Sequence, residues 1–262
     1  MTERAAQGAG AAPDEDILVI GSFVSPYVRK VLACMALKGL AYTIDPITPF
    51  YGNDDFTRLS PLRRIPVLVQ GDLALSDSSV ICAWLDEQYP DCHPLLPATP
   101  ADRARARWLE EFADTRMGDV FIWGLFYQKV VHPLVWKEPG DQARVAATLA
   151  TDMPMVLDYL EGQLPADGFL FGEIGLADVA LASFFPNARY AGFEVDAKRW
   201  PRTAAFVARC LAHDCFAATS RWEAAQLSTN PAGRRAALEE AGAPLSEVSY
   251  ALKEPRQGVM TL

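Results

Sequence analysis

The residues best suited to chemistry lie at a strand-to-helix junction, where Ser25 and Pro26 begin a helix. Serine is a favoured N-cap residue, and the fixed φ of proline suits the first helical position. Apolar residues then follow at helical spacing, beginning with Val28 and Val31. A helix N-terminus attracts anions, because its first N–H groups have no partners inside the helix. The junction is therefore a candidate anion site, although a serine that only caps a helix gives the same pattern.

A second segment, residues 62–85, has a similar organisation. Pro66 lies just inside an apolar strand, and because it has no N–H to donate it marks a strand start, a sheet edge or a cis peptide bond. Asp77 and Ser78 then begin another helix, since short polar side chains favour helix starts. Two widely separated segments thus predict the same kind of helix start.

This spaced set resembles the thioredoxin-like domain of cytosolic glutathione transferases. The resemblance implies that the side chain of Ser25 meets the glutathione sulfur. It implies a cis bond before Pro66, with the backbone of Ile65 pairing with the cysteinyl part of glutathione. It also implies that Asp77 and Ser78, where the family usually has Glu-Ser, hold the γ-glutamyl end.

The resemblance implies three further points. Arg64 is expected to meet the glycine carboxylate of glutathione. A third segment, residues 171–181, is similar to the stretch that leads into a buried helix in the family, with an aspartate at Asp178. Gly175 stands where the family often has a Ser or Thr cap. Serine rather than cysteine at position 25 favours glutathione conjugation, dehalogenation or isomerisation over disulfide reduction.

Two alternatives remain open from the sequence. One is a glutathione-binding or protein-interaction module that keeps this scaffold with little catalytic activity. The other is an unrelated thioredoxin-like protein whose helical part binds a partner. Binding of glutathione without turnover is the observation that would favour the first alternative.

The elements that position these residues divide into an α/β part and an all-α part. The predicted strands are 17–22, 41–47, 65–69 and 73–75, and the predicted helices between them are 26–38 and 77–89. The crossover helix between the first two strands predicts a parallel pair, whereas the short Gly71-Asp72 link predicts an antiparallel hairpin. We therefore expect a mixed four-stranded sheet with helices on its faces.

Beyond the proline-rich linker the pattern is helical almost throughout. Helices are predicted at 101–130, 141–162, 176–188, 201–212 and 215–226. We expect breaks at His132-Pro133, Glu138-Pro139-Gly140 and Trp200-Pro201, and a bend or interruption at Pro154. The predicted division is a disordered N-terminal tail over 1–16, a thioredoxin-like domain over 17–89, a linker over 90–100, a helical domain over 101–226 and a C-terminal extension over 227–262.

An aromatic stretch late in the first of these helices covers more directions than one buried face requires. We expect at least one of Trp123, Phe126 and Tyr127 to line a pocket for a hydrophobic second substrate, as the resemblance implies; core packing is the alternative. Tyr27 is a further candidate for this electrophile pocket, with simple packing left open.

Composition narrows the function classes. The formal net charge of −9 argues against nonspecific binding to nucleic acid or to an anionic membrane surface. The five cysteines form no C-x-x-C pair, and their odd number indicates a reducing, cytoplasmic setting. The three histidines share no metal-ligand spacing, so no metal is expected. The resemblance implies a homodimer with glutathione as co-substrate.

Overall fold

The computed structural model of the protein describes residues 16–229 and 233–256. Its sheet has four strands in the order β2-β1-β3-β4. The strands are β1 (Leu18–Ile20), β2 (Thr43–Asp45), β3 (Val67–Gln70) and β4 (Leu73–Leu75). β1 pairs parallel with β2 and antiparallel with β3, and β3 pairs antiparallel with β4. The predicted mixed sheet is confirmed, while the tail predicted over 1–16 lies outside the described residues except for its last residue.

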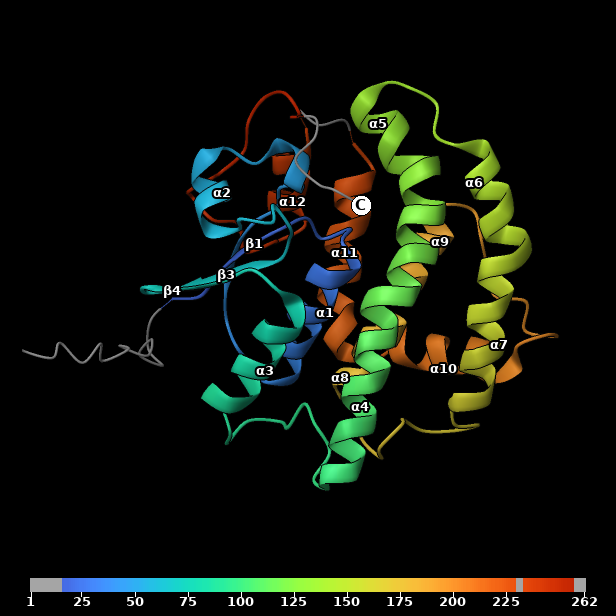
Figure 1. Ribbon diagram of the computed structural model, residues 1–262. Helices are drawn as coiled ribbons and strands as arrows, with labels where there is room; N and C mark the ends of the chain where they lie inside the picture. The colour runs from blue at the N-terminus through green and yellow to red at the C-terminus, as the bar shows by residue number, and fades with distance from the viewer. Residues whose placement is uncertain (1–15, 230–232, 257–262) are drawn as a thin grey trace, which may run out of the picture.

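Helix α1 (Pro26–Leu37) lies between the sheet and the helical domain (Figure 1). Helix α3 (Ser78–Gln88) follows β4 and packs beside α1. The structure adds two short elements that the sequence analysis did not predict, η1 (Pro49–Tyr51) and α2 (Asp54–Leu59). Both are too short to show a helical period, although the side chain of Asn53 caps α2 by accepting from the Phe56 N–H at 2.9 Å.

The helical domain begins with α4 (Pro100–Phe112), which continues without a break into the π-wound stretch η2 (Ala113–Val131) and then α5 (His132–Trp136). The break predicted at His132-Pro133 is therefore wrong. The chain leaves the helix only at Lys137, which has a φ of 60°. The wider π winding before Pro133 moves the preceding carbonyls, so the proline ring fits without ending the helix.

Pro154 is accommodated in the same way. The segment consists of α6 (Gln142–Ala147), the π-wound η3 (Thr148–Asp152) and α7 (Met153–Gln163). The α winding is interrupted before Pro154, as predicted, but the chain stays helical. In both places a proline follows a π-wound stretch instead of a loop.

The remaining helices are α8 (Leu176–Ala182), α9 (Phe185–Tyr190), α10 (Pro201–Leu211), α11 (Asp214–Leu227) and α12 (Arg234–Glu240). A large core runs without interruption from β1 and α1 through α8 to α11. Arg29 of α1 is fully buried in this core and binds Glu223 of α11 through two hydrogen bonds of 2.5 and 2.8 Å. Helix α1 and the helical domain are therefore joined by buried charge as well as by apolar packing.

Candidate functional site

Ser25 caps α1 a few residues after the end of β1. Its Oγ accepts a hydrogen bond from the Val28 N–H at 3.4 Å, and Pro26 occupies the first helical position. Since the described contacts use Ser25 Oγ as an acceptor, its O–H proton remains available to donate. The predicted cap is confirmed, and the helix start leaves the Tyr27 N–H as a further donor because Pro26 has none.

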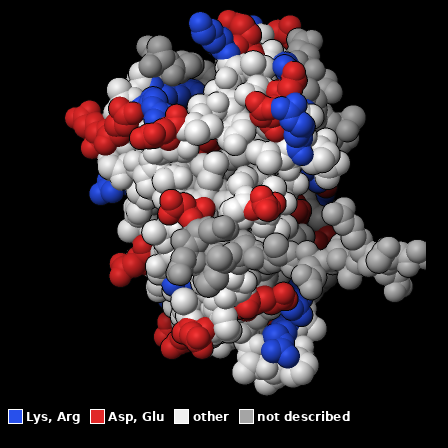
Figure 2. All heavy atoms as spheres, turned by 90° about the vertical axis from the view of Figure 1, so that its left-hand side faces the viewer, with Lys and Arg blue, Asp and Glu red and all other residues white. Residues whose placement is uncertain are grey.

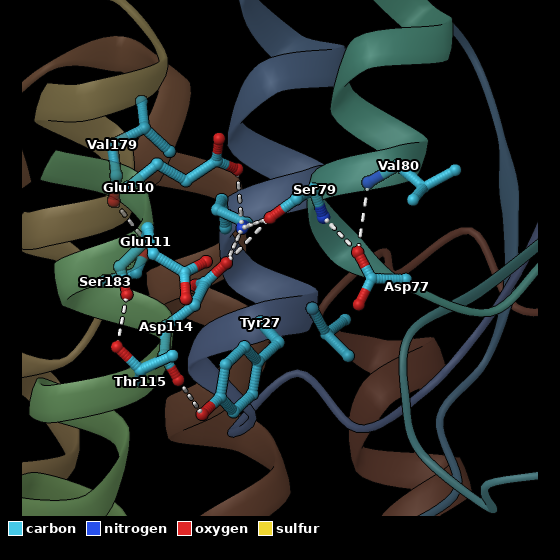
Figure 3. A network of polar contacts seen from close by, with 12 residues as sticks. Tyr27, Asp77, Ser79, Val80, Glu110, Glu111, Asp114, Thr115, Val179 and Ser183 are labelled. Atoms are coloured by element: carbon cyan, nitrogen blue, oxygen red, sulfur yellow. Dashed lines mark hydrogen bonds and ion pairs between the residues drawn. The ribbon is translucent and has the colours of Figure 1, made fainter. Parts of the chain in front are cut away.

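The second helix start lies at α3. Asp77 is its N-cap, and one carboxylate oxygen accepts from the N–H groups of Ser79 and Val80 at 2.9 and 3.1 Å. Asp77 is exposed and Ser78 is buried. Asp77 thus holds the start of α3 through Oδ1, and its other carboxylate oxygen makes no described hydrogen bond (Figure 3).

The Ile65–Pro66 peptide bond is cis, as predicted. Arg64 precedes it and is exposed. Its neighbour Arg63 is buried and points inward, where its guanidinium donates to the carbonyls of Pro49 and Gly52 at 2.9 and 2.7 Å. Of these two adjacent arginines, only Arg64 has a side chain on the surface.

A buried charge network lies beneath the two helix starts. Lys30 of α1 binds Glu110 of α4 at 2.9 Å and Asp114 of η2 at 2.5 Å. Ser79 of α3 donates to the same Asp114 oxygen at 2.9 Å, and Tyr27 donates to the Asp114 carbonyl at 3.0 Å. Figure 3 shows Asp114 between Tyr27 and Ser79. One residue of the helical domain therefore ties the start of α1 to the start of α3.

The charges of this network depend on one another. Burial acts to lower the pKa of Lys30, but the carboxylates of Asp114 and Glu110 outweigh it and raise that pKa above its ordinary value. Burial raises the pKa of Asp114, against the opposing effect of Lys30. Burial and the Asp114 carboxylate also raise the pKa of Tyr27, so its phenol stays neutral. Sequence reasoning missed Lys30 and Asp114, since an isolated charge on an amphipathic helix normally lies at the surface.

Tyr27 is held between the domains. Its ring packs edge-to-face on Phe184 with centroids 5.5 Å apart, and its hydroxyl lies against Gly118, where any side chain would collide with it. The other candidates for the electrophile pocket lie further along η2. Phe126 is buried in the core, while Trp123 and Tyr127 are half-buried and pack with their rings tilted by 57° and their centroids 5.3 Å apart.

Trp123 and Tyr127 belong to an aromatic cluster that crosses between the domains, together with Phe50 and Trp136. Phe50 of η1 packs at 5.6 Å from Trp136 and 6.2 Å from Tyr127. The Trp136 indole N–H donates to the Tyr127 hydroxyl at 3.1 Å. Phe50 and Trp136 were not predicted for this region, because only the fold brings η1 beside η2.

Charges on the surface agree with the acidic composition. Figure 2, which views the molecule from the side of β4, shows Asp and Glu side chains scattered over the surface, with Lys and Arg side chains beside several of them. Within residues 16–229 and 233–256, His, Cys, Asp and Glu form no group suited to a metal ion. No helix in the described part of the chain is long and apolar enough to cross a membrane.

The mixed sheet, the capped helix starts and the following helical domain together define a glutathione transferase fold. Residues 19–94 match the family described as glutathione S-transferase, N-terminal domain, and residues 142–209 match glutathione S-transferase, C-terminal domain. The chain belongs to the glutathione S-transferase family. Glutathione transferase activity, with glutathione as co-substrate, is the function that this membership supports.

Individual relatives agree with this family assignment. The probable glutathione S-transferase GSTU1 of Oryza sativa subsp. indica is 29% identical over 215 residues, covering 76% of this chain and 87% of the relative. A glutathione S-transferase from Rhodospirillum rubrum F11 superposes with a TM-score of 0.71 at 25% identity, covering 78% of this chain and 91% of that one. A glutathione S-transferase from Methylobacterium radiotolerans, solved with glutathione sulfonate, has a TM-score of 0.65 at 25% identity, covering 78% and 94%.

Proposed function

We propose that Ser25 holds the thiolate of glutathione for attack on a small hydrophobic electrophile. The observation that carries this proposal is the position of the Ser25 hydroxyl at the N-cap of α1, with its O–H proton free of the capping bond. The glutathione thiol loses its proton to solvent, and the thiolate sulfur forms a bond to the electrophilic carbon. The electron pair passes to the leaving group, or to an acceptor atom that is then protonated.

The energetics support two contributions. A thiol with a pKa near 8.5 needs roughly 2–3 kcal/mol of stabilisation to be mostly thiolate at neutral pH. A helix N-terminus contributes about 0.3–1 kcal/mol, and about 2 when partly buried. A hydrogen bond to a charged group adds about 1.5–3 kcal/mol. The helix and the hydroxyl together reach the required amount, whereas the helix alone reaches at most its lower limit. Ser25 is assigned as a thiolate stabiliser and not as a covalent nucleophile, because no described contact joins its hydroxyl to a base.

The rest of glutathione is assigned to the residues around this serine. The Ile65 backbone before Pro66 pairs with the cysteinyl part, and Arg64 meets the glycine carboxylate. At the γ-glutamyl end, Asp77 acts through Oδ2, because Oδ1 caps α3, and Ser78 stands beside it. This arrangement keeps the capping bonds of both helices intact while the ligand binds.

The second substrate is assigned to the aromatic cluster between the domains. Trp123 and Tyr127 are half-buried and pack against each other. Phe126, which is buried in the core, and Tyr27, which packs on Phe184, are assigned to the border of this pocket. An apolar electrophile fits such a surface, since aromatic rings offer large apolar contact areas. Conjugation, dehalogenation and isomerisation all use a thiolate in this position.

We also propose that the chain works as a cytoplasmic homodimer, with a thioredoxin-like domain over 17–89, a linker over 90–100 and a helical domain over 101–226. All five cysteines are free, which supports a reducing compartment. The homodimer follows the resemblance to the family. Sedimentation at several protein concentrations measures this oligomeric state.

Calorimetric titration with glutathione, followed by turnover assays on aryl halides, peroxides and disulfides, tests the proposed function. Saturable binding together with turnover of an aryl halide is the expected result. Binding without turnover would favour a glutathione-binding or interaction module. Absence of binding would contradict the assignment of Arg64, Ile65, Asp77 and Ser78.

A further inference from the structure

Residues 243–256, which we name the C-terminal strap, return from α12 to the sheet. Pro244 accepts a hydrogen bond from the Ile44 N–H at 2.8 Å, and the Ser246 N–H donates to the Ile44 carbonyl at 2.9 Å. These bonds place Leu245 in a parallel bridge with Ile44. Because β2 is the outer strand of the sheet, the strap covers its open edge.

A buried carboxylate fixes the next part of the strap. Asp45, at the end of β2, is 2% exposed. It accepts from the Ser249 hydroxyl at 2.9 Å and from the Tyr250 N–H at 2.7 Å. A buried carboxylate needs such donors, because it has lost its water. The strap is therefore anchored by specific bonds before it reaches η1.

The last part of the strap runs along η1. The Leu252 N–H donates to the Tyr51 carbonyl at 2.6 Å, and the Arg256 N–H donates to the Phe50 carbonyl at 2.8 Å. The Arg256 guanidinium also binds the Asp54 carboxylate at 2.6 Å. The backbone of Phe50 is thus held from the outer side by the strap.

The ring of Phe50 points the other way, into the aromatic cluster with Tyr127 and Trp136. The backbone on either side of Phe50 is also held by the buried Arg63, which donates to the Pro49 and Gly52 carbonyls. Phe50 is therefore clamped between Arg63 and the strap. Movement of the strap would therefore change the position of the Phe50 ring, which is the ring that the sheet domain contributes to this cluster.

We propose that the C-terminal strap is a positioning segment for selection of the second substrate, acting by fixing Phe50 in the aromatic cluster. This inference rests on the proposed function, in which the cluster receives the electrophile. The strap lies outside both segments that match the family, which end at residues 94 and 209. It makes no described bond to Ser25, Ile65 or Asp77, so glutathione binding should be largely independent of it.

The experiment compares two shortened chains, one ending at Ser249 and a control ending at Arg256. In the chain ending at Ser249, hydrogen exchange of the amides in 49–53 should accelerate. The ratio of kcat/KM for a small and a bulky electrophile should shift by about fivefold, with KM for glutathione changed by less than about twofold. The control should match the full chain in exchange and in kinetics.

A pair of point variants covers the case in which the shorter chain does not fold. Asp54 and Asp55 both lie in the first turn of α2, but Asp54 binds Arg256 whereas Asp55 binds Arg58. Asp54→Ala should accelerate exchange in 49–53 and shift the electrophile ratio in the same direction, and Asp55→Ala should do neither.

Unchanged exchange, or faster exchange with an unchanged electrophile ratio, would overturn the inference. Equal effects of Asp54→Ala and Asp55→Ala would also overturn it, since both substitutions would then act by weakening α2 and not by releasing Arg256. A full chain without turnover of any electrophile would instead contradict the proposed function. Exchange of 49–53 would then still decide whether the strap positions Phe50.

Discussion

At Ser25 one hydroxyl has two tasks, capping α1 through its lone pair and donating its proton to a thiolate. Ser25→Ala removes both, and Ser25→Gly removes the hydroxyl at a capping cost of only a few tenths of a kcal/mol. Both variants should lower turnover by at least about tenfold, because a hydrogen bond to a charged group is lost. Only Ser25→Ala should also lower the free energy of unfolding noticeably, by about 1 kcal/mol.

Thiolate absorbance of bound glutathione measures the effect directly. The pKa of the bound thiol should rise in both variants, while calorimetric affinity stays close to that of the unchanged protein. Normal turnover in Ser25→Gly would remove the hydroxyl from the mechanism and leave Ser25 as a cap.

Lys30 gives a second prediction at the residue scale. Lys30→Met leaves Glu110 and Asp114 buried without their cation, which should lower the free energy of unfolding by about 3–5 kcal/mol. Arg116→Met is the matched control, because Arg116 and Asp152 form an ion pair that is 38% exposed at each side chain. The control should cost less than about 1 kcal/mol. Urea unfolding measures both, and equal losses would show that the network adds no more than a surface pair.

The residues of the site differ in how far the sequence could predict them. Ser25 and Asp77 were predictable as helix caps because capping depends on local chain chemistry, whereas the cis bond before Pro66 was predicted from the resemblance to the family. Lys30 and Asp114 were not, since their pairing joins residues 84 positions apart. Burial of a charge depends on which helices meet, and no local pattern contains that information.

At the scale of elements, the start of α8 shows why glycine, and not a better capping residue such as serine, is the N-cap at position 175. Asp178 accepts from the N–H groups of Leu170 and Gly175, at 2.9 and 3.0 Å, and burial raises its pKa to about 6. A Cβ on Gly175 would lie 2.9 Å from the carbonyl oxygen of Leu95. The close approach of the linker, and not helix capping, therefore dictates glycine at this position.

We accordingly expect Gly175→Ser to lower the free energy of unfolding by about 1–3 kcal/mol, despite the better N-cap that serine provides. Gly162→Ala in α7 is the control, because no atom lies near the added Cβ. It should raise the free energy of unfolding by about 0.5–1 kcal/mol. Thermal unfolding of both variants tests this, and a stabilised Gly175→Ser would contradict the linker argument.

Elements with a clear period or turn signal were predicted close to their observed bounds, as α1 and the β3–β4 hairpin show. The sequence failed at Pro133, where proline indicates a break only if the preceding helix has α winding. It also gave no sign of η1, α2 or the strap bridge between Ile44 and Leu245. These features depend on short segments or on contacts between distant parts of the chain.

For the whole molecule, the two domains should separate in kinetics. Ser78→Ala should raise KM for glutathione with every electrophile, because the helix start at α3 serves the common substrate. Trp123→Ala should instead change the order of preference among electrophiles, by about 1–3 kcal/mol in kcat/KM. Kinetics with three chemically different electrophiles measure both. If Trp123→Ala weakens only glutathione binding, the aromatic cluster is not the electrophile site.

The route of the strap also has a consequence for synthesis of the chain. Residues 244–256 leave the ribosome after the other described segments that the sheet contacts, yet they supply the partners of Ile44 and of the Asp45 carboxylate. A nascent chain that has already formed β1 and β2 therefore carries an uncovered strand edge, which is a template for pairing with other chains. Completion of the first domain therefore awaits synthesis of residues 244–256.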